Sequence, residues 1–139
     1  FANFINVSRL PNVLADWFVT VDIPPLAVVV ICVGIYIVLG CILESISMML
    51  LTVPIFYPLV AGLGYDLIWF GIIVVVVIEI SLITPPVGLN VFVLKTMLPD
   101  VPLTSIFKGI GPFFVADLIR LAIVVFFPIV VLWLPTVMN

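Results

Sequence analysis

The sequence has very little charge and no histidine. Of its 139 residues 7 are acidic and 4 are basic, for a net charge of −3, while 66% are hydrophobic. Soluble domains are about a quarter charged, so this chain has too few charges to cover a surface in water, and we expect it to lie in a lipid bilayer. The missing histidine excludes histidine-based triads and histidine metal sites. The lack of a Lys or Arg cluster argues against nucleic-acid binding.

The chain is also poor in cysteine, and it is short. Cys32 and Cys41 stand nine residues apart in one apolar stretch, which puts them on opposite faces of a helix, so we do not expect them to pair. The first residue is Phe1 rather than Met, and no signal peptide is evident. Because 139 residues is short for a protein with several membrane crossings, we expect this chain to be part of something larger.

The few charges divide the rest into apolar runs. Residues 24–43 form an unbroken run that begins with two prolines, and about 20 apolar residues are needed to cross the hydrocarbon core. We expect a spanning helix there. Residues 1–22 are mixed and predict an interfacial arm, so that 1–43 form an arm and a helix. The apolar face of the arm would be formed by Leu10, Leu14, Trp17 and Phe18.

The run 45–65 has the length of a span but not its composition, because it contains two prolines and two glycines. Pro54 removes a backbone hydrogen bond and disfavours helical geometry at Val53. We therefore predict two short helices around a turn at Leu51–Pro54, and a re-entrant hairpin over residues 44–66.

Residues 67–97 predict a discontinuous helix. An apolar segment of helical length is interrupted by Thr-Pro-Pro-Val-Gly at 84–88 and then resumes. Exposed irregular backbone is not tolerated in lipid, so this break must face protein or water. Within 98–139, we expect an amphipathic loop over 98–111 and a last crossing over 112–134.

The predicted fold is therefore an all-α integral membrane protein with three crossings, one re-entrant helical hairpin and one broken helix. The positive-inside rule supports it, because a re-entrant 45–65 puts every basic residue on one side of the membrane. A spanning 45–65 would separate one of them from the others. The basic residues are Arg9, Lys95, Lys108 and Arg120.

The break has the chemistry of an ion and substrate site. Carbonyls at the end of a half-helix coordinate Na⁺, and N–H groups at the start of a half-helix attract anions. Here the carbonyls of Ile83 and Thr84 cannot bond to the prolines that follow, and a second half-helix near Gly88 presents the N–H groups of Leu89 and Asn90. The alternative interpretation is a proline kink packed on a neighbour.

Other polar residues have two interpretations each. The hydroxyls of Ser45, Ser47 and Thr52 at the hairpin tip are hard oxygen ligands, or they bond back to their own helix. Glu44 is an interfacial carboxylate, or it helps to hold a cation. Glu79, costly near mid-bilayer, is expected to face the bundle interior and be paired or protonated, with a structural or a transport role. Asp117 and Arg120 predict a local ion pair.

Two sequence runs carry a resemblance to a known family. GCILESISMMLLTVPIFYPLVAGLGYDLIWFG, followed by EISLITPPVGLNVFVL, strongly resembles the large membrane subunit of tripartite ATP-independent periplasmic (TRAP) transporters, in its C-terminal repeat. The resemblance implies a Na⁺-coupled secondary importer of organic acid anions, of the dicarboxylate or sialic-acid type, working as an elevator in the bacterial inner membrane. It implies the second half of an inverted repeat, with a scaffold helix before residue 44 and the transport domain after it.

The resemblance also implies partners and site residues. The partners are a small four-helix membrane subunit, a periplasmic substrate-binding protein and the first repeat of the large subunit. The chain is expected to be no enzyme and to use no cofactor, with Na⁺ as coupling ion. The predicted Na⁺ ligands are Glu44, Ser47, Thr52, Thr84 and Gly88. The predicted substrate-binding residues are Thr84, Pro85, Pro86 and Asn90.

Two other functions compete with transport. A channel or pore subunit also uses re-entrant loops, but a filter would need repeated carbonyl-lining glycines in place of a proline break. A non-transporting assembly subunit would have little use for an intramembrane glutamate and a TPPVG break. An intramembrane protease is weaker still, because the sequence has no histidine and no matched pair of aspartates.

Overall fold

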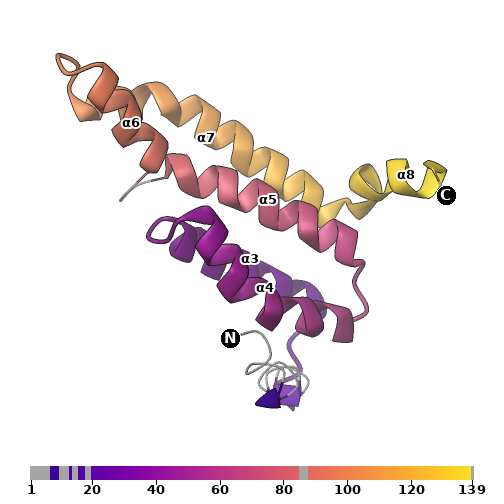
Figure 1. Cartoon of the computed structure of the whole chain (residues 1–139). Helices are drawn as coiled ribbons and strands as arrows, with labels where there is room; N and C mark the ends of the chain where they lie inside the picture. The colour runs from indigo at the N-terminus through magenta and orange to yellow at the C-terminus, as the bar shows by residue number, and fades with distance from the viewer. Residues whose placement is uncertain (1–6, 10–12, 14–15, 18–19, 85–87, 139) are drawn as a thin grey trace.

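A computed structural model describes residues 7–9, 13, 16–17, 20–84 and 88–138 (Figure 1). Within these ranges the chain is helical and has no strand, which confirms the predicted all-α fold. Much of the arm predicted for residues 1–22 lies outside the described residues. The helices are α3 (Pro25–Gly40), α4 (Ser45–Gly62), α5 (Leu67–Ile83), α6 (Leu89–Met97), α7 (Leu103–Phe126) and α8 (Pro128–Met138).

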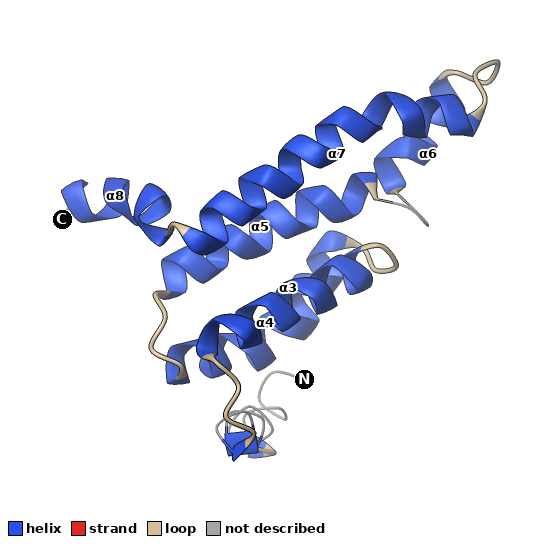
Figure 2. Cartoon of the chain, turned by 180° about the vertical axis from the view of Figure 1, so that it is seen from behind, coloured by secondary structure: helices blue, strands red, loops and turns tan. Residues whose placement is uncertain are grey.

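Helix α5 is the centre of the arrangement. It packs against α3 on one side and α7 on the other, and it also contacts α4, α6 and α8. Figure 2 shows the same order from behind, with α3 and α4 side by side and α6 beyond the end of α5. Its sequence, LIWFGIIVVVVIEISLI, is apolar almost all round, and such a helix is stable only when its neighbours or lipid cover it on every side.

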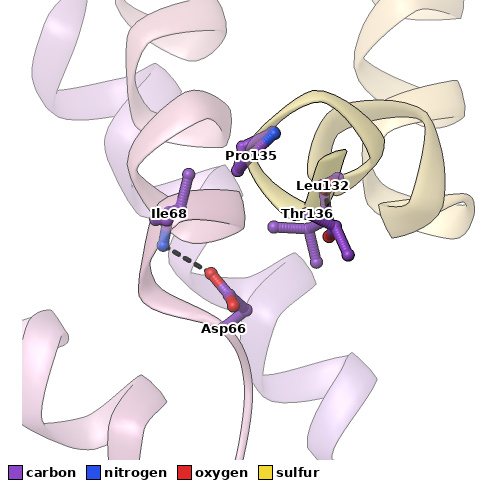
Figure 3. A pocket seen from close by; sticks show the side chains of 5 residues that line it. All are labelled: Asp66, Ile68, Leu132, Pro135 and Thr136. Carbon is purple, nitrogen blue, oxygen red and sulfur yellow. Dashed lines mark hydrogen bonds between the residues drawn. The ribbon is translucent and has the colours of Figure 1, made fainter. Parts of the chain in front are cut away.

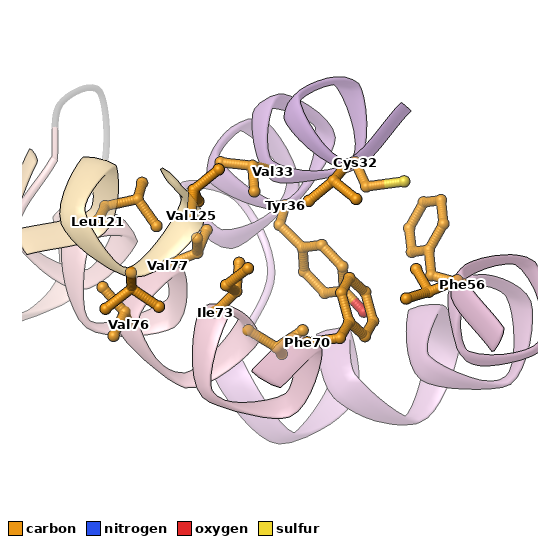
Figure 4. Close-up of a cluster of buried hydrophobic side chains, with 14 of the residues drawn as sticks. Cys32, Val33, Tyr36, Phe56, Phe70, Ile73, Val76, Val77, Leu121 and Val125 are labelled. Atoms are coloured by element: carbon orange, nitrogen blue, oxygen red, sulfur yellow. The ribbon is translucent and has the colours of Figure 1, made fainter. Parts of the chain in front are cut away.

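Aromatic and branched side chains fill the space between α3, α4 and α5 (Figure 4). The ring of Tyr36 lies 5.3 Å from that of Phe56 and 6.3 Å from that of Phe70, measured between centroids. On the other side of α5, the indole Nε1 of buried Trp69 donates to the carbonyl of Val124 at 2.7 Å. This bond satisfies a polar group in an apolar core and fixes α7 along α5.

The predicted turn at Leu51–Pro54 is wrong. Residues 45–62 form one continuous helix, with Pro54 and Pro58 inside it. A proline inside a helix of an apolar protein leaves a carbonyl unpaired, but neighbouring helices and hydroxyl side chains can compensate. The helical hairpin in the structure is formed instead by α3 and α4, and its connection is Cys41–Glu44.

The last predicted segment also differs. Helix α7 begins at Leu103, nine residues before the predicted start at Pro112, and keeps that proline inside. It ends at Phe126, so the predicted crossing 112–134 is divided. Phe127, with φ −124° and ψ 72°, leaves helical geometry because it precedes Pro128, and Pro128 starts α8.

Membrane-spanning length is reached by two helices among the described residues. Helices α4 and α7 are long and apolar enough to cross, while α3, α5 and α8 are apolar but shorter. The 16 residues of α3 extend over about 24 Å, less than the roughly 30 Å of a hydrocarbon core. The number of crossings stays a prediction.

A charged cluster links α5 and α7. Arg120 lies 3.1 Å from Asp117, which confirms the predicted ion pair, and 2.5 Å from Glu79 across the two helices. Glu79 is therefore paired as predicted. Its side chain is 55% exposed and does not face the interior of this helix group. In lipid, half-exposed charges are costly unless they stay paired with each other or are covered by another polar surface.

We expect the Glu79–Arg120 contact to stabilise the α5–α7 pair. A double-mutant cycle with Glu79→Gln and Arg120→Gln should give a coupling energy of about 0.6–1.7 kcal/mol, the range of polar contacts between membrane helices. The cycle with Asp117→Asn and Arg120→Gln should give less, because those residues belong to one helix. Unfolding by dodecyl sulfate in mixed micelles measures both, and a Glu79–Arg120 coupling near zero contradicts the expectation.

Candidate functional site

Two helices lie on either side of residues 84–88, where the sequence predicts a broken helix, and a single crossing made of both stays a prediction. Helix α5 ends at Ile83, and Thr84 follows in extended geometry with φ −86° and ψ 134°. Helix α6 begins at Leu89 after Gly88. Pro85 and Pro86, predicted to bind substrate, lie outside the described residues.

Gly88 is suited to this break for two reasons. Its φ is +53°, in the left-handed region that side chains disfavour. A Cβ there would also lie 3.2 Å from Val91 Cγ2 and 3.3 Å from the carbonyl oxygen of Thr84, both tighter than ordinary contacts. The residue before α6 therefore lies against the carbonyl of Thr84, so the end of α5 and the start of α6 are close together.

The polar side chains at the two ends of the break differ in hydrogen bonding and burial. The hydroxyl of Thr84 is half-buried and donates to the carbonyl of Ile80, four residues earlier in α5. Its oxygen keeps lone pairs that can coordinate a cation. Asn90 lies in the first turn of α6 with its side chain exposed.

Glu44 caps the N-terminus of α4. Its carboxylate accepts the backbone N–H of Ile46 at 3.0 Å and that of Ser47 at 3.1 Å, and the Ser47 hydroxyl lies 3.3 Å away. These backbone donors hold the pKa of the Glu44 carboxyl below its usual value of 4.5. Glu44 and Ser47 are both exposed, so the carboxylate remains accessible at the α3–α4 turn.

The α3–α4 turn lies close to the end of α5 in both overall views (Figures 1 and 2). Gly40, just before the turn, is packed against Ser81, three residues before Thr84. The structure therefore brings the Glu44–Ser47 turn and the Thr84–Gly88 break to the same end of the helix group. Neither Gly40 nor Ser81 was among the predicted site residues, and the only signal in the sequence is their small size.

Thr52 lies apart from the turn. It is buried in α4, 2% exposed, and its hydroxyl donates to the carbonyl of Met48 at 2.7 Å. The turn expected beside it does not exist, so Thr52 is no longer at a hairpin tip. Its assignment as a Na⁺ ligand stays a prediction.

Two pockets among the described residues are lined by none of the predicted ligands. One of about 260 Å³ lies between the start of α5 and α8, at the end of α5 opposite the break (Figure 3). There Asp66 caps α5 by accepting the N–H of Ile68 at 2.8 Å. Another, of about 250 Å³, is lined by Ile83 and by apolar residues and a glycine of α7.

These features define a class: helical membrane proteins in which a helix is interrupted beside a helical hairpin. Within that class the relationship is specific. Residues 1–130 match the family of the DctM component of tripartite ATP-independent periplasmic transporters. The chain belongs to this family of TRAP transporter permeases, and the resemblance noted in the sequence is confirmed.

Curated relatives agree with the family. The chain is 33% identical over 128 residues to the sialic acid TRAP transporter large permease protein SiaM of Vibrio cholerae serotype O1, covering 92% of this chain and 30% of that protein. It is 35% identical over 135 residues to the C4-dicarboxylate TRAP transporter large permease protein DctM of Pseudomonas aeruginosa, covering 97% and 31%. The chain thus spans less than a third of the length of these two relatives.

The Glu44 cap should give a pH-dependent stability. Because the folded-state pKa of Glu44 is lowered, its stabilisation is full above the unfolded value of 4.5 and is lost as the pH falls through the folded value. The melting temperature of Glu44→Ala should therefore lie below that of the unaltered chain at pH 7, and this difference should disappear below pH 4.5. Glu44→Gln, which does not titrate, is the control. A gap between the unaltered chain and Glu44→Ala that is independent of pH would contradict the assignment.

Gly88 and Gly64 form a matched pair for testing the packed break. Both have positive φ, but nothing lies within 4 Å of a Cβ at Gly64. Gly64→Ala should cost only backbone strain, about 1–2 kcal/mol. Gly88→Ala should cost roughly 1 kcal/mol more, because its Cβ also presses on Thr84 and Val91. Unfolding in mixed micelles compares the two, and equal losses would show that the two half-helix ends are not in contact.

Proposed function

We propose that this chain is the part of a TRAP transporter large permease that carries a broken helix of the transport domain. The whole permease would be a multi-pass protein of the bacterial inner membrane that imports organic acid anions, driven by Na⁺, through an elevator movement. It would act as a transporter rather than as an enzyme. The family membership supports the permease role, and the break between α5 and α6, with Gly88 packed on Thr84, is the observation that carries the mechanism.

The Na⁺ site would lie between the break and the α3–α4 turn. Na⁺ prefers oxygen ligands, and hydroxyl, carboxylate and carbonyl oxygens are available there from Glu44, Ser47, Thr84 and the backbone near Gly88. Thr52 is retained as a proposed ligand, with its hydroxyl bonded to the carbonyl of Met48 inside α4. Glu44 would supply the only full negative charge in this ligand set.

The anion would bind at the start of α6. The first N–H groups of a helix have no partners within it and carry the positive end of its dipole, so they attract a carboxylate. Asn90, exposed in the first turn, would add an amide donor, and Thr84, Pro85 and Pro86 would line the same place. The relatives SiaM and DctM are named for sialic acid and C4-dicarboxylates, both carboxylates, which supports this substrate class.

The partners follow from the same proposal. A periplasmic binding protein would deliver the anion, and a small four-helix membrane subunit would accompany the large one. Since the chain spans less than a third of these relatives, a first repeat of the large subunit would supply the other half of the substrate cavity.

Thr84→Val tests the cation site. In proteoliposomes containing the assembled transporter and its binding protein, it should raise the Na⁺ concentration for half-maximal uptake about 5- to 10-fold, the effect of losing one ligand contact of about 1–1.4 kcal/mol. Thr96→Val is the matched control, because Thr96 also donates to a carbonyl of its own helix but lies away from the break. Thr52→Val is measured in parallel, with the same direction expected.

An unchanged Na⁺ dependence in Thr84→Val, at normal protein levels, would remove Thr84 from the site. Currents without any solute gradient would favour a channel instead.

A further inference from the structure

Helices α3 and α5 approach each other closely at Gly40. Gly40 is the last residue of α3 and is buried. A Cβ at this position would lie 2.5 Å from Ser81 Oγ, 2.6 Å from Ser81 Cβ and 3.3 Å from Met48 Sδ. Separations under 3.0 Å do not occur for real Cβ atoms, so only glycine permits this contact.

The partner of Gly40 is held in place. Ser81 is 2% exposed, and its hydroxyl donates to the carbonyl of Val77 at 2.7 Å, which fixes the side chain along α5. Met48, in the first turn of α4, is fully buried beside it. The end of α3, the first turn of α4 and the last turn of α5 therefore meet at one point.

This point lies between the two halves of the candidate site. Gly40 directly precedes the Cys41–Glu44 turn, after which Ser47 follows in the first turn of α4. Ser81 lies three residues before Thr84, in the last turn of α5. We propose that Gly40 and Ser81 form a size-matched positioning pair, which sets the separation between the α3–α4 turn and the α5–α6 break and thereby the fit of the cation between them. The cation part of this inference rests on the proposed function.

Helix α3 contains a built-in control. Gly34 lies nearly two turns earlier, and a Cβ placed there would have nothing within 4 Å. Gly34→Ala adds the same methyl group and favours the helix without a clash, whereas Gly40→Ala forces α3 and α5 apart. The two variants should therefore change melting temperature in opposite directions.

The first experiment measures the separation directly. Spin labels are carried by non-native amino acids at Ile42 and Leu89, which are 69% and 44% exposed, so the native cysteines stay in place. In the full chain in lipid nanodiscs, Gly40→Ala should lengthen the mean separation by about 1 Å or more, because close-packed contacts cannot absorb a methyl group. Gly34→Ala should leave it unchanged, and Gly40→Ala with Ser81→Gly should restore it.

Two further variants keep the test informative if Gly40→Ala fails to fold. Ser81→Gly alone removes volume and should broaden the distance distribution without lengthening its mean. Ser81→Val enlarges the contact from the other helix and should act like Gly40→Ala. The proposal is overturned if Gly40→Ala leaves the mean separation unchanged. It is also overturned if the separation in the double variant differs from that in the unaltered chain as much as it does in Gly40→Ala.

The second experiment separates positioning from plain stability. In the assembled transporter, Gly40→Ala should raise the Na⁺ concentration for half-maximal uptake several-fold, and adding Ser81→Gly should reverse this. A merely structural contact would lower the amount of protein and the maximal rate but leave the Na⁺ dependence as it was. A changed separation with unchanged Na⁺ dependence overturns the positioning role. If Thr84→Val is then also without effect on Na⁺ dependence, the proposed cation site fails as well.

Discussion

The structure depends on one constraint: the central helix α5 is apolar on almost every side and then stops at a stretch of irregular backbone. An apolar helix needs cover on all faces, and irregular backbone in an apolar environment needs partners for its polar groups. Two neighbours meet the first need. Helix α3 covers one side of α5 and ends level with its last turn, where Gly40 meets Ser81. Helix α7 covers the other side, fixed by the bond from Trp69 to the carbonyl of Val124.

Three hydroxyls inside the described helices are satisfied in the same way. The hydroxyls of Thr52, Ser81 and Thr84 each donate to a carbonyl four residues earlier in the same helix. Such bonds satisfy the donor locally, and they let polar residues occupy helices that must be apolar outside. At Thr84 the same local bond leaves an oxygen at the edge of the break, where a ligand is needed.

The features that could be predicted are those that a few neighbouring residues determine. The end of α5 at Ile83 and the start of α6 after Gly88 follow from two prolines and a glycine in sequence, whereas the positive φ of Gly88 was not predicted. Pro54 misled the prediction because a proline disfavours a helix only locally, while packing of Phe56, Leu59 and Val60 on the rest of the core favours its continuation. The start of α7 was misplaced by the same reasoning at Pro112. The Gly40–Ser81 contact joins residues 41 positions apart, and no local pattern reports such a meeting.

In the proposed function, the charges around the break also explain why two different ions would be coupled. Among the proposed ligands only Glu44 is ionised, and its charge is already partly met by the N–H groups of Ile46 and Ser47. A lone cation near Glu44 would be only partly neutralised by that carboxylate. A lone anion at the start of α6 would be stabilised only by the partial positive charge of helix N–H groups. Each ion therefore lowers the cost of placing the other in a region of low dielectric constant. That mutual dependence requires the turn and the break to keep a fixed separation, because Coulomb attraction falls with distance. The close contact of Gly40 with Ser81 would supply that fixed separation.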